Sequence, residues 1–181
     1  GVEALPPFLV SLVSASDVWA YISTRGGLTA GRVDAKRALF PYETDDRLHH
    51  ASGRTGPLTL IRVGDSLWQP FDERGLAPGR ERLLRKAADG SWLELEERAP
   101  DLGLVFRQRW VTSGRFGLVR RCVLEGDAAD VELLDGLLNL MPADVPLRAQ
   151  EALSALVDAY KRSELLPGDV GLYAMDAHLS D

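Results

Sequence analysis

The stretch LGLVFRQRWVT, residues 102–112, alternates in polarity with the period of a β-strand. Its apolar face carries Leu102, Leu104, Phe106 and Trp110. Arg107 and Arg109 point to the other side, because successive residues of a strand face opposite ways. After a turn at Ser113-Gly114, residues 116–124 repeat the apolar pattern. We therefore expect an antiparallel pair of strands with one buried face.

The segments around this pair predict further short strands separated by turn residues. The expected strands cover residues 8–13, 17–24, 28–33, 58–63, 66–71, 131–140 and 171–178. Turns are indicated at Gly26-Gly27, Gly64-Asp65 and Gly126-Asp127. Gly136, inside an expected strand, indicates a β-bulge. Short strands at this spacing predict a mainly β fold, an antiparallel β-sandwich rather than a βαβ fold.

Residues 80–98 fit two structures. The run ERLLRKAA contains strong helix formers, whereas a two-residue turn at Asp89-Gly90 would fold the segment into a hairpin. The hairpin register pairs Arg85 with Glu94, Leu84 with Leu95, Arg82 with Glu97 and Glu81 with Arg98. Three opposite-charge pairs and one apolar pair favour the hairpin. In that hairpin we expect residues 94–97 to form a solvated face.

One amphipathic helix is expected near the C-terminus. Asp144 can cap it, Pro146 suits its first turn, and Pro167-Gly168 ends it. Its apolar stripe would carry Ala149, Leu153, Leu156, Val157 and Tyr160. The sequence thus predicts a single β-sandwich domain over residues 1–181 with one C-terminal helix.

Composition limits the partners and the cellular compartment that we expect for the protein. The chain has 181 residues and a net charge of −6, which argues against nucleic-acid partners and anionic membrane surfaces. No apolar run approaches the roughly 20 residues that span a bilayer. The lone cysteine, Cys122, excludes an internal disulfide and fits a buried thiol in a reducing, cytoplasmic compartment. Gly1 lacks a preceding methionine, so we interpret it as a tag scar on a domain excised from a longer chain, with an exposed apolar surface around residues 149–166.

Unusual chemistry is concentrated in residues 23–50. The candidate ligand-binding residues there are Arg32, Tyr42, Asp45 and Asp46. The two aspartates could bind sugar hydroxyls or act as an acid/base pair, although a turn or helix cap also explains them. Arg32 could pair with either aspartate or contact a ligand. The glycines Gly26, Gly27 and Gly31 could admit a ligand or only satisfy turns, and their spacing fits no nucleotide-binding fingerprint, so no cofactor is expected.

Other chemistries find little support. His49 and His50 lie beside no cysteine cluster, and His178 is the only other histidine, so no metal site is expected. No elbow motif supports Ser/His/Asp catalysis, and no catalytic residue is assigned. The aromatic residues Trp19, Tyr21, Tyr42, Trp68, Trp92 and Trp110 are either sugar-stacking platforms or core residues.

Five motifs give a resemblance that covers most of the chain. They are GGLTAGR at 26–32, ALFPYETDD at 38–46, DGLLNLMPADVP at 135–146, VDAYKRSEL at 157–165 and GLYAM at 171–175. Together they resemble the N-terminal region of cellobiose-phosphorylase-like proteins. The resemblance implies a galactose-mutarotase-like supersandwich that precedes an (α/α)6 barrel, where the catalytic carboxylate lies. A chain of 181 residues has no room for that barrel.

The resemblance implies an accessory domain of a glycoside hydrolase or phosphorylase-like protein. Such a domain would pack on a helical barrel, contribute to carbohydrate binding and carry no catalytic residue. Two alternatives stay open: a free-standing binding module with its own ligand pocket, and a small hydrolase that uses Asp45 or Asp46.

Overall fold

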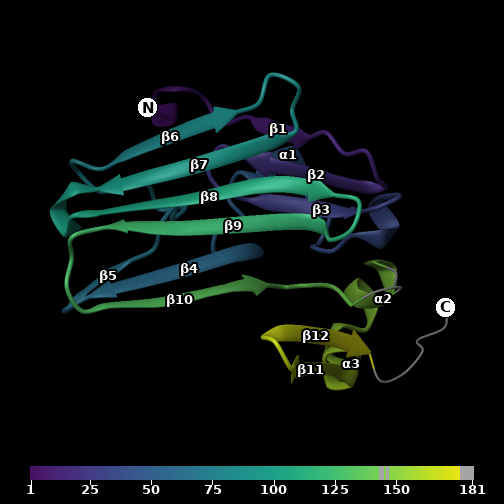
Figure 1. Ribbon diagram of the computed structural model, residues 1–181. Helices are drawn as coiled ribbons and strands as arrows, with labels where there is room; N and C mark the ends of the chain where they lie inside the picture. The colour runs from purple at the N-terminus through teal and green to yellow at the C-terminus, as the bar shows by residue number, and fades with distance from the viewer. Residues whose placement is uncertain (143–144, 146, 176–181) are drawn as a thin grey trace.

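The computed structural model describes residues 1–142, 145 and 147–175, and it is a mainly β, antiparallel sandwich (Figure 1). One layer is a four-stranded sheet in the order β6-β7-β8-β9. Its strands are β6 (Glu81–Lys86), β7 (Trp92–Ala99), β8 (Leu104–Ser113) and β9 (Gly117–Gly126). The expected pair of strands at residues 102–124 is thus β8 and β9, joined in one continuous register.

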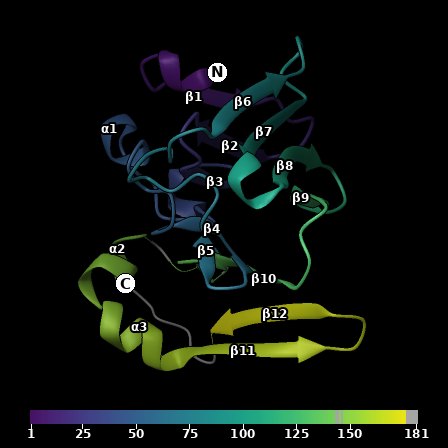
Figure 2. The ribbon, with the colours of Figure 1, turned by 90° about the vertical axis from the view of Figure 1, so that its left-hand side faces the viewer.

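The facing layer contains two three-stranded sheets, in the orders β1-β2-β3 and β10-β4-β5 (Figure 2). The strands are β1 (Leu9–Leu12), β2 (Val18–Ser23), β3 (Leu28–Arg32), β4 (Gly56–Val63), β5 (Ser66–Trp68) and β10 (Val131–Leu138). Short helical turns cover residues Val2–Ala4 (η1), Ala35–Arg37 (η2), Asp45–Leu48 (α1) and Pro100–Leu102 (η3).

The core lies between the layers, where the apolar faces of the alternating strands meet. Its main side chains are Val10, Leu12, Ala20, Ile22, Leu28, Ala30, Ile61, Trp68, Leu93, Leu95, Leu104, Phe106 and Trp110. In β8 the residues at every second position are buried, as the alternation predicts. The sandwich is therefore held by apolar burial between sheets, the dominant favourable term in folding.

The structure confirms the hairpin over residues 80–98. β6 and β7 pair in the predicted register, with Arg85 opposite Glu94 and Glu81 opposite Arg98. The predicted solvated face at residues 94–97 is wrong in part, because Glu96 and Glu97 are only 1% and 2% exposed. Glu97 points into the core, and Glu96 is covered by arginine side chains on the outer face.

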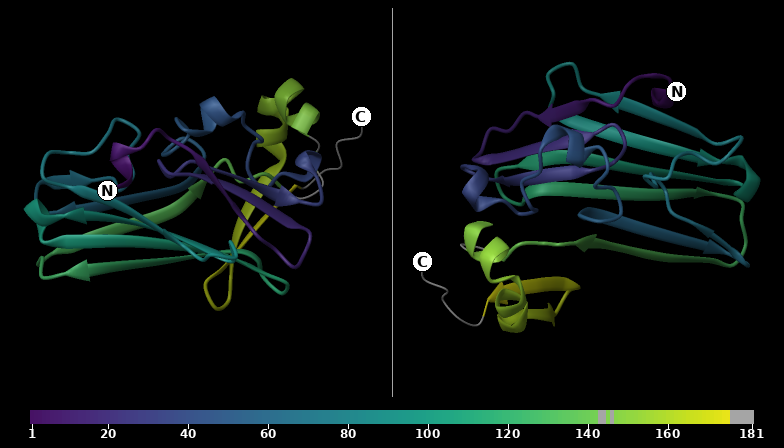
Figure 3. Two further views of the ribbon diagram at one scale, coloured as in Figure 1. Left: turned by 90° about the horizontal axis from the view of Figure 1, so that it is seen from above. Right: turned by 180° about the vertical axis from the view of Figure 1, so that it is seen from behind.

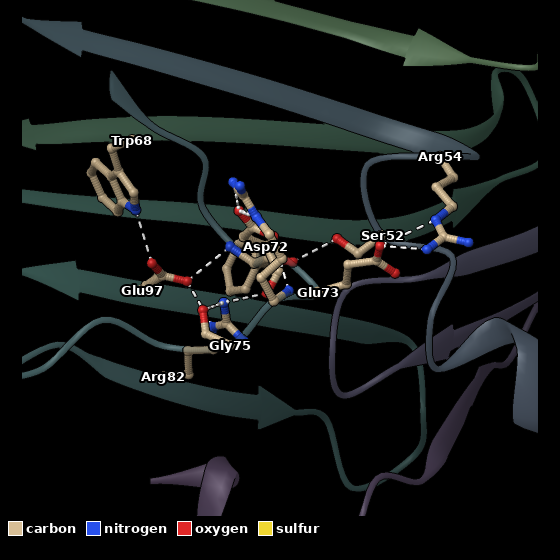
Figure 4. A network of polar contacts seen from close by, with 10 residues as sticks. Ser52, Arg54, Trp68, Asp72, Glu73, Gly75, Arg82 and Glu97 are labelled. Atoms are coloured by element: carbon tan, nitrogen blue, oxygen red, sulfur yellow. Dashed lines mark hydrogen bonds and ion pairs between the residues drawn. The ribbon is translucent and has the colours of Figure 1, made fainter. Parts of the chain in front are cut away.

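A buried polar network surrounds Glu97 (Figure 4). Its carboxylate accepts hydrogen bonds from the Trp68 indole at 2.8 Å, the Phe71 backbone N–H at 2.8 Å and Arg82 Nε at 2.7 Å. Phe71 has a φ of 59°, a left-handed conformation that is unusual for a bulky residue. Its carbonyl oxygen also accepts the hydroxyl of Ser52. The sequence predicts a strand that continues to Phe71. These bonds explain why β5 ends earlier, at Trp68.

The C-terminal region differs from its prediction. Two short helices, α2 (Leu147–Ala152) and α3 (Ser154–Tyr160), replace a single helix, and the chain then forms a hairpin of β11 (Lys161–Leu166) and β12 (Val170–Met175). Pro167 and Gly168 lie in the hairpin turn, so they reverse the chain after a strand instead of ending a helix. The expected cap Asp144, Pro146 and the end of the last predicted strand lie outside the described residues.

The helices and the β11-β12 hairpin lie beside the sandwich, near the end of β10 (Figure 3). Of the predicted apolar stripe Val157 is buried, whereas Leu153, Leu156 and Tyr160 are exposed. Leu165 is also exposed, so this region carries the expected apolar surface. β10 pairs with β4 without interruption, so the predicted bulge at Gly136 is wrong. No helix among the described residues is long and apolar enough to cross a membrane.

Candidate functional site

An aromatic cluster lies on the solvent side of the β1-β2-β3 sheet. We use this name for Trp19, Tyr21 and Tyr42. Trp19 and Tyr21 alternate with the buried residues of β2 and therefore point outward. Tyr42 meets Trp19 edge to face, with ring centroids 5.9 Å apart, and Tyr21 lies 6.2 Å from Trp19. Tyr21 is 40% exposed and Tyr42 is 50% exposed, so both rings offer surface to a ligand.

Residues 34–51 run along the edge of β3, where Ala38 bridges Gly31, and they bring Tyr42 to β2. The Thr29 hydroxyl of β3 donates to the Pro41 carbonyl at 3.2 Å, which fixes the chain just before Tyr42. Trp19 Nε1 donates to the Asp34 carbonyl at 3.2 Å. Gly31 makes this arrangement possible, because a Cβ there would collide with the Trp19 ring and the Arg37 carbonyl oxygen. Gly31 thus admits an aromatic side chain of the protein itself.

The same segment contains a hydrogen-bonded chain of Ser23, His49 and Asp45. Ser23 Oγ lies 2.8 Å from His49 Nδ1, and His49 Nε2 lies 3.2 Å from Asp45 Oδ1. This order of groups matches the parts of a nucleophilic triad. Ser23, however, is 0% exposed, and its oxygen also accepts the Arg25 backbone N–H at 3.1 Å. A nucleophile without access to solvent cannot reach a substrate, so this chain anchors α1 to β2.

Asp45 remains available to a ligand. Its side chain is 73% exposed, and His49 contacts only one of its oxygens in the described structure. Asp45 follows Tyr42 by three residues, so these two predicted site residues belong to one short segment. An exposed carboxylate can accept hydrogen bonds from hydroxyl groups.

Asp46 and Arg32 have polar partners outside the aromatic cluster. Asp46 accepts the Thr44 hydroxyl at 2.5 Å and lines an open groove of about 490 Å³ with Arg47, His50 and Arg54. The hydrogen bond from Thr44, followed by that from the Arg47 backbone, lowers the pKa of Asp46. This shift is opposite to what a general acid needs at neutral pH.

Among the described residues, the Arg32 guanidinium forms an ion pair with Asp17, at 2.8 Å, and with neither Asp45 nor Asp46. The pair borders a separate cavity of about 320 Å³, lined also by Arg37, Leu39 and Met141. The four predicted site residues therefore have separate partners: Tyr42 packs on Trp19, Asp45 contacts His49, Asp46 accepts from Thr44, and Arg32 pairs with Asp17.

The remaining candidate aromatic residues have structural surroundings. Trp68 and Trp110 are 1% and 2% exposed and belong to the core. Trp92 lies under the Arg109 guanidinium, 4.6 Å from the ring centroid, on the charged outer face of the four-stranded sheet. Trp68 and Trp110 are therefore core residues and not sugar-stacking platforms.

The geometry also bears on thiol catalysis and on metal binding. Burial raises the pKa of the Cys122 thiol to about 11, so a thiolate nucleophile is disfavoured at neutral pH. Within residues 1–142, 145 and 147–175, no three His, Cys, Asp or Glu side chains are grouped to hold a metal ion.

Sequence reasoning did not connect Ser23 with His49, which are 26 residues apart and share no motif. The sequence predicts only part of the grouping of Trp19, Tyr21 and Tyr42. Their alternation in β2 shows that the first two share a face, but the path of residues 34–51 brings Tyr42 to them. Comparison with known proteins adds no family: no protein-family model matches this chain, and no curated protein matches it.

Proposed function

We propose that this chain is a non-catalytic accessory domain of a carbohydrate-active protein of the glycoside hydrolase or phosphorylase type, and that it contacts carbohydrate through the aromatic cluster. The observation that carries the proposal is the grouping of Trp19, Tyr21 and Tyr42 on a solvent-facing sheet surface, and the exposed carboxylate of Asp45 follows Tyr42 by three residues in the same segment. Aromatic faces pack against the C–H faces of sugar rings, and a carboxylate accepts their hydroxyl groups.

The resemblance to the N-terminal region of cellobiose-phosphorylase-like proteins supports the same function. It extends over GGLTAGR and ALFPYETDD, the segments that contain Gly31 and Tyr42. The proposed partner is a helical barrel domain. Exposed apolar side chains on β10 and the following region support it, since exposed apolar surface often marks an interface. They are Leu133, Leu134, Leu137, Leu153, Leu156 and Leu165.

The inaccessibility of Ser23 and the lowered pKa of Asp46 support an accessory role without catalysis. Ser23 is inaccessible, and the hydrogen bonds to Asp46 keep its carboxyl group ionised. A cytoplasmic location is part of the proposal, supported by the single cysteine, Cys122.

Isothermal titration with neutral oligosaccharides of several linkages tests the proposal. We expect weak binding to at least one of them, and Tyr42→Ala should reduce the affinity about tenfold, since a stacked ring contributes roughly 1 kcal/mol or more. Tyr160→Ala is the matched control, because Tyr160 is 41% exposed but lies on α3, away from the cluster. Absence of binding to the whole panel, or equal losses in the two variants, would refute sugar recognition by the aromatic cluster.

A further inference from the structure

A third pocket lies between the two layers of the sandwich. Its volume is about 350 Å³, at the small end of ligand pockets in proteins. Its main walls are Phe40, Trp110, Leu118, Arg120, Asp135 and Leu140. Trp110 and Arg120 are opposite each other on β8 and β9, whereas Asp135 lies on β10 in the facing layer. The pocket is thus built by both layers.

A charged pair occupies the polar side of this pocket. Arg120 Nη1 donates to both oxygens of Asp135, at 2.9 and 2.8 Å. Arg120 also donates to Gln108 at 3.0 Å and to Thr59 at 2.9 Å, and the Thr59 hydroxyl donates to Asp135 at 2.6 Å. The Arg120 side chain is only 10% exposed and that of Asp135 is 32% exposed. The pair therefore carries two opposite charges that cancel at the partly open side of the pocket.

Trp110 adds a second unusual feature. Its Nε1 is the one buried side-chain nitrogen or oxygen in the described part of the chain that has no hydrogen-bond partner. Buried donors are nearly always paired, so an unpaired one in the wall of a pocket calls for an acceptor. The Arg120 guanidinium lies 5.8 Å from the centre of the Trp110 ring, so the indole and the charged pair border the same space.

We propose that this pocket binds a small neutral ligand with hydroxyl groups on a saturated ring, such as a single sugar ring or a cyclic polyol. The ligand is neutral because Arg120 and Asp135 already balance each other, so the pocket offers no unpaired charge to an ionic ligand. Phe40, Leu118 and Leu140 cover the C–H groups of the ring. Asp135 accepts a hydrogen bond from a ligand hydroxyl, and Trp110 Nε1, which is buried beside the pocket, donates to a ligand oxygen after the indole rotates toward it.

This inference does not rest on the proposed function. It uses residues of β8, β9 and β10, whereas the aromatic cluster lies on the outer face of β1-β2-β3. Either site can bind its ligand while the other does not, and separate variants distinguish them.

The experiment is a titration of the ¹⁵N-labelled full chain followed by ¹H–¹⁵N correlation spectra. The indole N–H signal of Trp110 is identified by its loss in Trp110→Phe. Glucose, galactose and myo-inositol are the neutral probes, and glucuronate and glucosamine are the charged probes. We expect the Trp110 signal to shift with at least one neutral probe and with neither charged probe. No shift with any neutral probe, or equal shifts with charged ones, overturns the proposal.

Variants then locate the binding. Leu118→Trp should fill the pocket and abolish the response, whereas Leu67→Trp, at a position 68% exposed on β5, should leave it intact. Asp135→Asn keeps the shape but leaves Arg120 uncompensated, so the affinity for the neutral probe should fall about tenfold and glucuronate should now bind. An unchanged profile in Asp135→Asn, or loss of the Trp110 response in Tyr42→Ala, would place the binding elsewhere. If Leu118→Trp fails to fold, Asp135→Asn alone decides the question.

Discussion

Arg82 Nε lies 2.7 Å from Glu97 Oε2, and both side chains are almost fully buried, at 2% and 3% exposed. Their strands are adjacent, with Arg82 opposite Glu97 in the β6-β7 register. The remaining polar atoms are used as well: Glu97 accepts from Trp68 and Phe71, and Arg82 Nη2 donates to the Asp72 carbonyl at 3.0 Å. The sequence pairs Arg82 with Glu97 in what looks like a surface hairpin. In the structure the two form a fully hydrogen-bonded ion pair inside the sandwich.

Removal of one partner of this pair should be costly. We expect Glu97→Gln to lower the free energy of unfolding by about 3 kcal/mol, because it leaves the buried Arg82 charge with only the partly exposed Glu3, 3.2 Å away, as a counter-charge. Urea denaturation measures the change. Glu132→Gln is the control: Glu132 pairs with Arg62 at the surface, where both side chains are more than half exposed, so its loss should be about 0–1 kcal/mol. Equal effects of the two substitutions would show that the core pair has no special role.

Glu96 gives the protein a predictable response to acid. Burial alone would raise the pKa of Glu96, but hydrogen bonds from Arg85, Arg107 and Arg98 outweigh it and lower the pKa from 4.5 to about 2. The folded state therefore keeps a carboxylate where the unfolded state binds a proton. Its stabilisation is complete above pH 4.5 and is lost as the pH falls toward 2.

Glu96→Gln should flatten this acid dependence and cost about 1–3 kcal/mol at neutral pH, the penalty of weakening a buried, charge-assisted network. Urea midpoints of the wild type and the variant, measured from neutral pH down to the acid limit, give both quantities. Glu125→Gln is a suitable control, because Glu125 is 58% exposed and contacts only Arg107 among the three arginines. Parallel pH profiles for wild type and Glu96→Gln would contradict the prediction.

Gly27 tests how α1 is seated on the β2-β3 turn. A Cβ at this position would collide with the carbonyl oxygen of Leu48, the last residue of α1. Gly27→Ala should therefore destabilise the fold by about 1–3 kcal/mol through overpacking. Gly114→Ala is the matched substitution, since nothing lies within 4 Å of its added methyl group, and its effect should stay within about 0.5 kcal/mol. Thermal unfolding compares them, and a harmless Gly27→Ala would mean that α1 moves away easily.

Alternation and charge register were sufficient to predict much of the sandwich. The pairing of Arg85 with Glu94 is local, so the sequence on both sides of Asp89-Gly90 contains all the information that sets it. The C-terminal hairpin was missed because residues 161–166 have reasonable helix propensity, and their strand partner lies in residues 170–175. For residues 161–166, a helix and a strand are both acceptable local structures, and pairing with β12 selects the strand.

The candidate site was harder to predict than the fold. Tyr42 was identified, but its contact with Trp19 depends on the route of residues 34–51 along the edge of β3. The inter-sheet pocket has no sequence signature, because Arg120 and Asp135 come from strands in different layers. Burial of Glu97 was also hidden, since a glutamate inside a charged run gives no sign that it faces the core.

The last prediction is that the isolated chain turns over no glycoside. Hydrolysis needs two carboxyl groups flanking one sugar bond, about 5–5.5 Å apart for retention or 6.5–9.5 Å for inversion, and phosphorolysis still needs one general acid with a raised pKa. Asp45 is turned toward His49, whereas Asp46 is held by Thr44, with a lowered pKa. Ser23, the only hydroxyl in the His49 chain, is inaccessible.

We therefore expect no release of product from aryl glycosides or disaccharides, with or without phosphate, by the wild type. Asp45→Ala, Asp46→Ala and Ser23→Ala serve as comparisons, because each removes one group that a hidden catalytic site would need. Turnover that persists in all three variants would point to a contaminating enzyme, since it would depend on none of these groups. Turnover that Asp45→Ala or Asp46→Ala abolishes would instead replace the accessory-domain proposal with a small hydrolase, because only a catalytic carboxylate accounts for a loss of chemistry in a chain that still folds.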